Sequence, residues 1–292
     1  MSNHHFFDSQ LDPFKAQQLL HSLKIKPNKK LGQNFLVDKN IAAKLISVAN
    51  LSKETDEILE VGPGLGCLTS LLVKNTKKVH AIELDKRLYR FLKDETSKNE
   101  NLNLILGDVL KIEIPSHNKV VSNIPYTITG PLLSKLLFKS NAPEIYMIIE
   151  KALADRIMAQ PNTEAFSRLS VSVKTFAKPT IIQKIQRKCF YPIPKIELTM
   201  IKLIPHGKID EFFDLEENIK LFLNLLRGIF PYKNKDSVNA LYLYLKKFEV
   251  SKADTLGLLK SSQKSKKIRA FDLNDFFMIA KEIESQGLLR EN

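Results

Sequence analysis

The spacing of apolar residues predicts alternating strands and helices over the first two thirds of the chain. Short apolar runs, typical of buried β-strands, recur between segments whose apolar positions repeat every three or four residues, as in amphipathic helices. Strands are expected at residues 57–61, 78–82, 102–106, 119–122 and 145–150. Because strand and helix alternate in this order, we expect a parallel sheet covered by helices on both faces.

The last third of the chain has a different pattern. Two more strands are expected at 180–185 and 197–204, and beyond them the apolar period is helical, at 217–230, 237–248, 252–259 and 273–285. We therefore predict an α/β domain over residues 27–205 and a small helical domain over residues 206–292. Residues 1–26 are expected to form an N-terminal extension with a short amphipathic segment.

Composition narrows the class of protein. Of the 292 residues, 43% are hydrophobic, which is enough for a sizeable core. Cys67 and Cys189 suggest neither a disulfide framework nor a metal site, and the six histidines have no ligand spacing. Residues 1–10 lack the apolar stretch of a signal peptide, and no run approaches the roughly 18 apolar residues that span a bilayer. We expect a soluble, cytoplasmic monomer without a bound metal.

The charge is strongly positive and unevenly distributed. The formal net charge is +13. Residues 206–292 hold 15 Lys and Arg against 13 Asp and Glu, whereas residues 151–205 hold 10 against 3. This concentration favours a partner rich in phosphate, such as RNA, over a merely solvated surface. Such a surface supplies affinity and steering but does not select a sequence.

A glycine-rich turn follows the first strand of the alternating region. Gly62, Gly64 and Gly66 have the spacing G-x-G-x-G, which lets the backbone approach a ligand closely in front of a helix N-terminus. The spacing differs from the G-x-G-x-x-G of dinucleotide sites, so we expect a ligand with a nucleoside and a carboxylate rather than a pyrophosphate. Taken alone, the loop is equally compatible with a tight turn that binds nothing.

Acidic residues end the next two predicted strands. Glu83 lies about twenty residues beyond the loop, where a carboxylate accepts the ribose hydroxyls of a nucleoside, and Asp85 is the alternative. Leu84 is expected to pack on the adenine ring. Asp108 either accepts the adenine amino group or caps the next segment. Ligands bind at the carboxyl ends of the strands in open α/β sheets, and these residues all fall there.

The tetrapeptide Asn123-Ile124-Pro125-Tyr126 follows the fourth strand. The Asn123 side chain and the Ile124 carbonyl offer acceptors to an exocyclic amine, and Tyr126 offers an aromatic face to the ring that carries it. Pro125 fixes φ and donates no hydrogen bond, so the corner is rigid. Accepting both amine hydrogens frees the nitrogen lone pair for attack on a methyl group. We therefore predict methyl transfer from S-adenosylmethionine to an unpaired base or amide nitrogen, by positioning and electrostatics.

A second aromatic segment, Phe190-Tyr191-Pro192-Ile193-Pro194, separates the last two predicted strands. Phe190 is expected to form the other face of a base sandwich with Tyr126. The alternative is a proline-rich loop whose aromatic ring belongs to the core. Four basic residues crowd the segment and suit contacts to phosphate: Lys184, Arg187, Lys188 and Lys195.

Together these motifs resemble the KsgA family of ribosomal RNA adenine dimethyltransferases, over about residues 27–205. Residues 30–36, Lys-Leu-Gly-Gln-Asn-Phe-Leu, are similar to the opening motif of that family, and the resemblance implies that Asn34 and Leu36 contact the cofactor. Residues 60–66, 83, 107–108 and 123–126 are similar to its cofactor and catalytic motifs. The resemblance implies a Rossmann-like class I S-adenosylmethionine-dependent methyltransferase sheet with a small C-terminal α-helical domain that contacts rRNA.

The resemblance also implies a reaction: dimethylation of N6 on two adjacent adenosines near the 3′ end of small-subunit rRNA, during small-subunit biogenesis. Three departures are visible. Glu150-Lys151-Ala152 stands where the family usually has Gln-Lys-Glu, Leu198 stands where a small polar residue is common, and residues 232–236 are less basic than the usual Arg/Lys cluster. The last departure weakens the expected rRNA contacts of the helical domain but not the chemistry. The extension before residue 27 lies outside the bacterial pattern and suits an archaeal or eukaryotic-like member.

Two other functions are compatible with parts of the sequence. A catalytically idle transcription or assembly factor of the same fold would bind nucleic acid without transferring methyl groups. The intact Asn123, Pro125, Tyr126 and Glu83 favour catalysis over that alternative. An enzyme that methylates a protein glutamine would share the Asn-Pro corner, but the basic surface and the Phe190 segment disfavour it.

Overall fold

The computed structural model describes residues 11–28, 32–139 and 141–288, which form two compact units. Unit 1 comprises the described residues of 1–136, 142–154 and 180–204. Unit 2 comprises those of 137–141, 155–179 and 205–292. The segment 155–179 therefore groups with the C-terminal helices, and the domain boundary at residue 206 stays a prediction.

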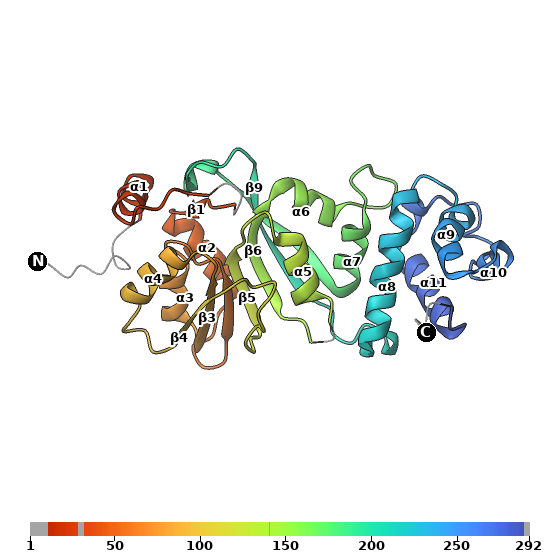
Figure 1. Cartoon of the computed structure of the whole chain (residues 1–292), viewed down its shortest axis with the longest axis horizontal. Helices are drawn as coiled ribbons and strands as arrows, with labels where there is room; N and C mark the ends of the chain where they lie inside the picture. The colour runs from red at the N-terminus through yellow and green to blue at the C-terminus, as the bar shows by residue number, and fades with distance from the viewer. Residues whose placement is uncertain (1–10, 29–31, 140, 289–292) are drawn as a thin grey trace, which may run out of the picture. The chain divides into compact units, whose positions relative to one another are not determined.

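A seven-stranded sheet forms the centre of unit 1, in the order β4-β3-β2-β5-β6-β9-β7 (Figure 1). The pairs among β2 to β6 are parallel, and β9 runs antiparallel to β6. The Rossmann-like arrangement is therefore confirmed, with an antiparallel extension. The strands are β2 (Glu57–Val61), β3 (Lys78–Glu83), β4 (Leu102–Leu106), β5 (Lys119–Asn123), β6 (Glu144–Glu150), β7 (Ala177–Ile185) and β9 (Leu198–Pro205).

Helices connect the parallel strands. Because such connections are right-handed, α3 and α4 cover one face of the sheet, and α5 covers the other after the strand order reverses at β5. The helix before β2 begins at Asp38, whose carboxylate accepts hydrogen bonds from the first free backbone N–H groups. The helices are α2 (Lys39–Ala49), α3 (Thr69–Asn75), α4 (Lys86–Glu95), α5 (Thr129–Leu137) and α6 (Lys151–Met158).

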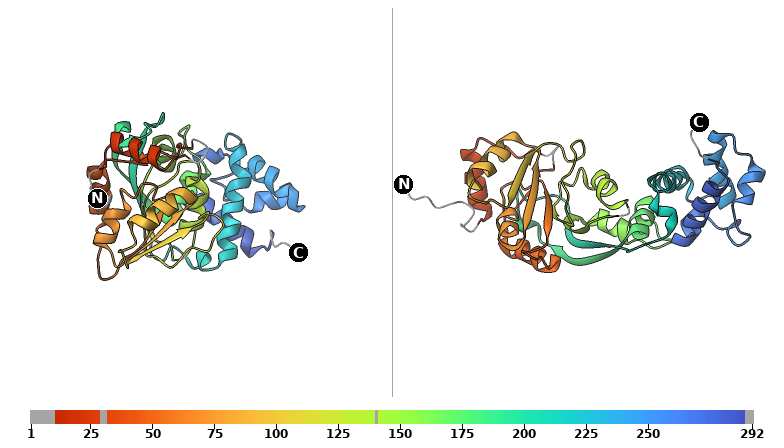
Figure 2. Two further views of the ribbon diagram at one scale, coloured as in Figure 1. Left: turned by 60° about the vertical axis from the view of Figure 1, so that its left-hand side comes forward. Right: turned by 90° about the horizontal axis from the view of Figure 1, so that it is seen from below.

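The described part of the predicted N-terminal extension is packed into unit 1. Helix α1 (Pro13–Ser22) contacts β8 (Phe190–Tyr191), and the left view of Figure 2 shows α1 in red beside the teal segment. Ala16 and Leu20 of α1 belong to the main hydrophobic core. Strand β1 (Phe35–Leu36) pairs antiparallel with β8, a contact across about half the chain that the sequence pattern did not predict.

Unit 2 is helical, with a core of phenylalanine rings. Its helices are α7 (Arg168–Phe176), α8 (Glu216–Ile229), α9 (Ser237–Leu245), α10 (Lys252–Gly257) and α11 (Leu273–Ser285). The ring of Phe213 packs edge-on against Phe176 and Phe222, with centroids 5.2 and 5.4 Å away. A Cβ at Gly228 would lie 2.1 Å from the Tyr244 ring, so only glycine lets α8 and α9 approach this closely.

Residues 151–173 are expected from the sequence to be helical with a turn around Pro161-Asn162, and they form α6 and α7 on either side of that turn. Ser167 begins α7 with a capping box, in which its side chain and that of Ser170 bond to each other's backbone N–H. This pair satisfies N–H groups that a continuous helix would have paired internally.

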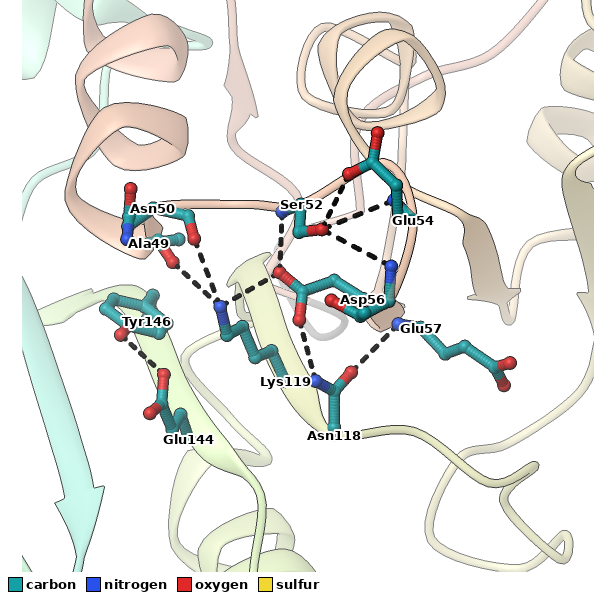
Figure 3. A network of polar contacts seen from close by, with 11 residues as sticks. Ala49, Asn50, Ser52, Glu54, Asp56, Glu57, Asn118, Lys119, Glu144 and Tyr146 are labelled. Carbon is teal, nitrogen blue, oxygen red and sulfur yellow. Dashed lines mark hydrogen bonds and ion pairs between the residues drawn. The ribbon is translucent and has the colours of Figure 1, made fainter.

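A network of polar side chains lies at the amino ends of the parallel strands (Figure 3). Lys119 Nζ donates to Asp56 Oδ2 at 2.9 Å and to the Ala49 carbonyl, at the end of α2, at 3.2 Å. The Asn118 amide donates to Asp56 Oδ1 at 2.7 Å and accepts from the Glu57 N–H at 2.8 Å. Burial raises the pKa of Asp56, but the hydrogen bonds from Lys119 and Asn118 outweigh burial and hold that pKa below its usual range.

Over the residues that the structure describes, no helix is both long enough and apolar enough to cross a membrane.

Candidate active site at the carboxyl edge of the sheet

A cavity opens at the carboxyl ends of the parallel strands. It holds about 1060 Å³ free of protein atoms, its open mouth included. Most of the predicted site residues line it: Asn34, Leu36, Gly62, Gly64, Glu83, Leu84, Asp108, Asn123, Ile124, Pro125 and Tyr126. Gly66 and Phe190 are the two predicted residues outside the lining.

The glycine loop is shaped by close contacts. Gly62 and Gly64 have φ values of +69° and +61°, a region that side chains rarely adopt. A Cβ at Gly64 would lie 2.8 Å from the Phe35 ring, and one at Gly62 would lie 3.2 Å from Pro125. Gly66 closes the turn instead, since its N–H donates to the Pro63 carbonyl at 2.9 Å. The first two glycines therefore form the cavity wall, and the third shapes the entry into α3.

Glu83, not Asp85, presents its carboxylate to the cavity. Glu83 is 5% exposed, and its two oxygens accept hydrogen bonds from the Gly64 and Asp85 N–H groups at 3.1 and 2.8 Å. Each oxygen keeps a second lone pair for a ligand hydroxyl. Burial raises the pKa of Glu83, and the backbone hydrogen bonds oppose that shift. The Asp85 carboxylate lies outside the lining and is bound by Arg87 and Gln33.

Asp108 caps the turn after β4 and also lines the cavity. Its Oδ1 accepts from the Leu110 N–H at 3.0 Å, and its other oxygen lies 3.8 Å from Lys111 Nζ. Leu84 lines the same cavity and is 51% exposed, as suits a side chain that covers an adenine ring.

Asn123 has one paired and one unpaired amide atom. Its Nδ2 donates to the Asn34 backbone carbonyl at 3.2 Å, which joins the opening motif to the catalytic corner. Its Oδ1 is buried and receives no hydrogen bond from the described residues. In the next residues, the Pro125 carbonyl accepts from the Ile128 N–H at 3.1 Å, whereas the Ile124 carbonyl has no such partner within the described chain. Asn123 Oδ1 and the Ile124 carbonyl are therefore two acceptors of the corner without a partner among the described residues.

Tyr126 lies partly in the cavity lining and partly against the hydrophobic core. Its hydroxyl is buried and bonds to none of the described residues. Burial, followed by the charge of Glu150, raises the pKa of this phenol, so Tyr126 stays neutral and aromatic at physiological pH. Its stacking role is still a prediction.

The structure places Phe190 in the hydrophobic core. Phe190 is fully buried and pairs with Leu36 through the β1–β8 ladder. A residue with 0% exposure outside the lining of this cavity has no face to offer a base there. The geometry thus supports the alternative of a core ring and gives no support to the predicted sandwich.

Among the lining residues that sequence reasoning had not chosen as site residues are Gln33, Phe35 and Glu60. Glu60 is 2% exposed, its Oε2 accepts from the Thr69 hydroxyl at 2.7 Å, and burial raises its pKa to about 8. In the sequence, Glu60 could have been recognised as a site residue because it is an acidic residue inside an otherwise apolar strand. In the described part of the chain, no group of three or more His, Cys, Asp or Glu could hold a metal ion.

Comparison with known proteins identifies the family. Residues 24–282 match the family described as Ribosomal RNA adenine dimethylase. The chain belongs to the ribosomal RNA adenine dimethylase family. A probable ribosomal RNA small subunit methyltransferase A from Pyrococcus furiosus is 39% identical over 221 residues, 76% of this chain and 77% of that protein. A ribosomal RNA small subunit methyltransferase A from Clostridium botulinum is 36% identical and covers 77% of this chain and 83% of its own.

Solved structures agree with this membership. A dimethyladenosine transferase from Plasmodium falciparum superposes with a TM-score of 0.75 at 29% identity, over 86% of this chain and 97% of that one. The 23S rRNA methyltransferase ErmE, at 22% identity and a TM-score of 0.63, shares the fold over 86% of this chain and 100% of its own. A member of the dimethylase family is a methyltransferase that depends on S-adenosylmethionine.

The cavity fits that cofactor. Gly62 and Gly64 have positive φ values, and neighbouring atoms occupy the places where a Cβ would stand. Bare backbone therefore forms this part of the cavity wall. A buried carboxylate with spare lone pairs at Glu83 suits ribose hydroxyls, and Asp108 Oδ2 suits an adenine amino group. Asn34, Leu36 and Leu84 complete the wall around these groups.

Proposed function

We propose that this protein dimethylates N6 of two adjacent adenosines near the 3′ end of small-subunit rRNA, during assembly of the small ribosomal subunit. The observation that carries the proposal is the pair of acceptors at the corner, Asn123 Oδ1 and the Ile124 carbonyl, beside a cavity suited to a nucleoside. The small-subunit rRNA methyltransferases and the dimethyladenosine transferase among the relatives support this substrate class.

The corner acts on the nucleophile. An adenine amine delocalises its lone pair into the ring and is a poor nucleophile. Asn123 Oδ1 and the Ile124 carbonyl accept the two amine hydrogens and favour tetrahedral nitrogen, and Pro125 keeps the two acceptors in fixed geometry. When bound, S-adenosylmethionine supplies an electrophilic methyl group on a sulfonium centre.

No strong base is needed at the corner. The amine becomes acidic only after it carries the new methyl group, so the proton can pass to the neighbouring acceptor oxygens and to water. Asn123 Oδ1 exposes less than 1 Å² of surface, so the amine reaches it after a small displacement of the cavity wall. Tyr126 lines the same wall and is proposed to stack on the unpaired base.

We also propose that the protein acts as a cytoplasmic monomer and binds rRNA through basic residues of 151–205. That range carries the largest excess of Lys and Arg. Nothing in the described residues favours the catalytically idle factor or the glutamine methyltransferase.

The proposal is tested by methyl transfer from labelled S-adenosylmethionine to small ribosomal subunits that lack the modification, with nucleoside analysis of the rRNA. We expect N6,N6-dimethyladenosine at two adjacent positions from the wild-type protein, and none from Asn123→Ala. If both proteins bind the subunits and neither transfers label, the enzyme proposal is wrong and the idle factor is favoured.

A further inference from the structure

A chain of hydrogen bonds links the carboxylate of the ribose pocket to the catalytic amide. The Asp85 N–H donates to Glu83 Oε1 at 2.8 Å, and Gln33 Nε2 donates to Asp85 Oδ2 at 3.4 Å. Gln33 precedes Asn34, whose backbone carbonyl accepts from Asn123 Nδ2 at 3.2 Å. Glu83 and Asn123 are therefore connected through Asp85 and residues 33–34.

Both partners of the central contact are held from a second side. Gln33 Oε1 accepts from the Asn28 N–H at 2.8 Å, and the Gln33 N–H donates to the Asn28 carbonyl at 3.2 Å. The Asp85 carboxylate accepts from Arg87 Nε and Nη2 at 3.2 and 3.0 Å and from the Arg87 N–H at 2.9 Å. The Gln33 side chain therefore forms hydrogen bonds with both its oxygen and its nitrogen. Arg87 holds the Asp85 carboxylate that accepts from the nitrogen.

We propose that Gln33 and Asp85 form a latch that positions the Asn34 carbonyl and, through it, the Asn123 amide. This inference rests on the proposed function, in which Asn123 Oδ1 accepts a hydrogen of the target amine. A carbonyl accepts hydrogen bonds only from the nitrogen end of an amide, so Asn34 selects the rotamer that leaves the oxygen end for the substrate. Asp85 lies outside the cavity lining and acts only through this chain, so it is a positioning residue.

A charge swap tests the latch because it can keep the hydrogen bonds while exchanging donor and acceptor. Gln33→Glu sets a carboxylate against Asp85. In Gln33→Glu/Asp85→Asn, the new amide donates to the new carboxylate, which can still accept from the Asn28 N–H. Gln33→Met is the second single variant, since it removes both hydrogen bonds without adding charge. Thermal unfolding of each variant shows whether it is folded.

The first readout is the NMR signal of the Asn123 side-chain amide in the ligand-free protein. It is measured by 15N NMR, together with the rate of hydrogen exchange of that amide. The second is kcat and KM for methyl transfer. We expect both single variants to shift the Asn123 amide signal, speed its exchange and lower kcat about 10- to 100-fold, as for a catalytic group displaced by about 1 Å. We expect the double variant to regain the wild-type signal and most of kcat.

Three results would overturn the latch. The single variants could leave both the Asn123 signal and kcat unchanged, or the double variant could be as impaired as Gln33→Glu. The third is a rise in KM for S-adenosylmethionine that Asp85→Asn does not correct, because Gln33 would then act by touching the ligand directly. The NMR readout needs no catalysis, so a wild-type protein without methyl transfer would refute the proposed function and leave the latch to be judged by the Asn123 signal.

Discussion

Two asparagines flank strand β5 and differ in how their amides are used. Asn118, just before the strand, donates to Asp56 and accepts from the Glu57 N–H (Figure 3). Asn123, at the end of the strand, donates to the Asn34 carbonyl, and its oxygen receives nothing from the described residues. The Asn118 amide satisfies the buried Asp56 carboxylate and so stabilises the fold, whereas a buried acceptor without a donor costs about 1–3 kcal/mol. The amino edge of the sheet therefore contributes to stability, whereas its carboxyl edge keeps a free acceptor for function.

Ionisable groups follow the same division. At the amino edge, Lys119 and Asn118 hold the pKa of Asp56 below its usual range despite burial. At the carboxyl edge, burial raises the pKa of Glu60 and Glu83. The amino edge therefore stabilises its charge, and the carboxyl edge holds carboxylates that the folded protein has not fully compensated. Uncompensated groups of this kind cluster at functional sites.

The largest expected effect comes from removing the unpaired acceptor. Asn123→Ala should lower kcat by about 100- to 1000-fold, as does the loss of one preorganised group at other enzyme sites. Affinity for S-adenosylmethionine should change little, because Glu83 and Asp108 remain. Single-turnover transfer and equilibrium binding measure the two quantities. A proportional loss of affinity would place Asn123 in cofactor binding instead.

Removing the cation of the amino edge should cost stability and leave chemistry intact. Lys119→Met leaves the Asp56 carboxylate buried without its ion pair, which should destabilise the protein by about 3 kcal/mol in urea unfolding. Because the folded pKa of Asp56 is lowered, the stability it contributes is present above its unfolded pKa of 3.8 and is lost as pH falls below it. The variant should lack this acid-dependent loss.

Lys77→Met is the matched control for Lys119→Met. Lys77 pairs with Glu57 at 2.8 Å on the same edge, but its side chain is 53% exposed. Exposed pairs contribute little, so this variant should unfold almost like the wild type. If Lys119→Met and Lys77→Met lost the same free energy of unfolding, burial would not explain how much the Lys119–Asp56 pair stabilises the protein.

Glu60→Gln should change how stability depends on pH. The folded carboxyl has a pKa of about 8 against an ordinary value of 4.5, so between these values the folded protein holds a proton that the unfolded chain has released. Wild-type stability should therefore fall as pH rises from 4.5 to 8 by more than that of Glu60→Gln. Unfolding of both proteins across this range gives the difference, and parallel curves would contradict the raised pKa.

A small expected effect separates core packing from base recognition at Phe190. Phe190→Leu should destabilise the protein by about 1 kcal/mol, because a smaller apolar side chain refills most of the site. Methyl transfer at a temperature where the variant is folded should stay within a factor of two or so. A loss of kcat comparable to that of Asn123→Ala would restore the sandwich that the sequence suggested.

The sequence predicted the features that depend on local patterns. Apolar runs located the five parallel strands to within a residue or two, and the polar residues that follow them were expected at one edge because parallel strands end there. Glu83 could be placed by its distance from the glycine loop. It was preferred over Asp85 because it ends the predicted strand, but the binding of the Asp85 carboxylate by Arg87 and Gln33 could not be predicted.

The features that were missed depend on distant contacts. The sequence left open whether the Phe190 ring stacks on a base or belongs to the core, because the pairing with the two residues of β1 that buries it is a distant contact. The raised pKa of Glu60 comes from the burial of its carboxyl group, which no local sequence pattern reveals.

The central claim is that the two ends of β5 serve different purposes, and one paired measurement tests it most directly. Asn123→Ala and Asn118→Ala are compared with the wild type for the single-turnover rate of methyl transfer and for the midpoint of thermal unfolding. We predict a crossed result: Asn123→Ala loses the rate and nearly keeps the midpoint, and Asn118→Ala loses several degrees of midpoint and keeps the rate while folded. Variants that both lose the rate to a similar extent, or both keep it, would contradict the account.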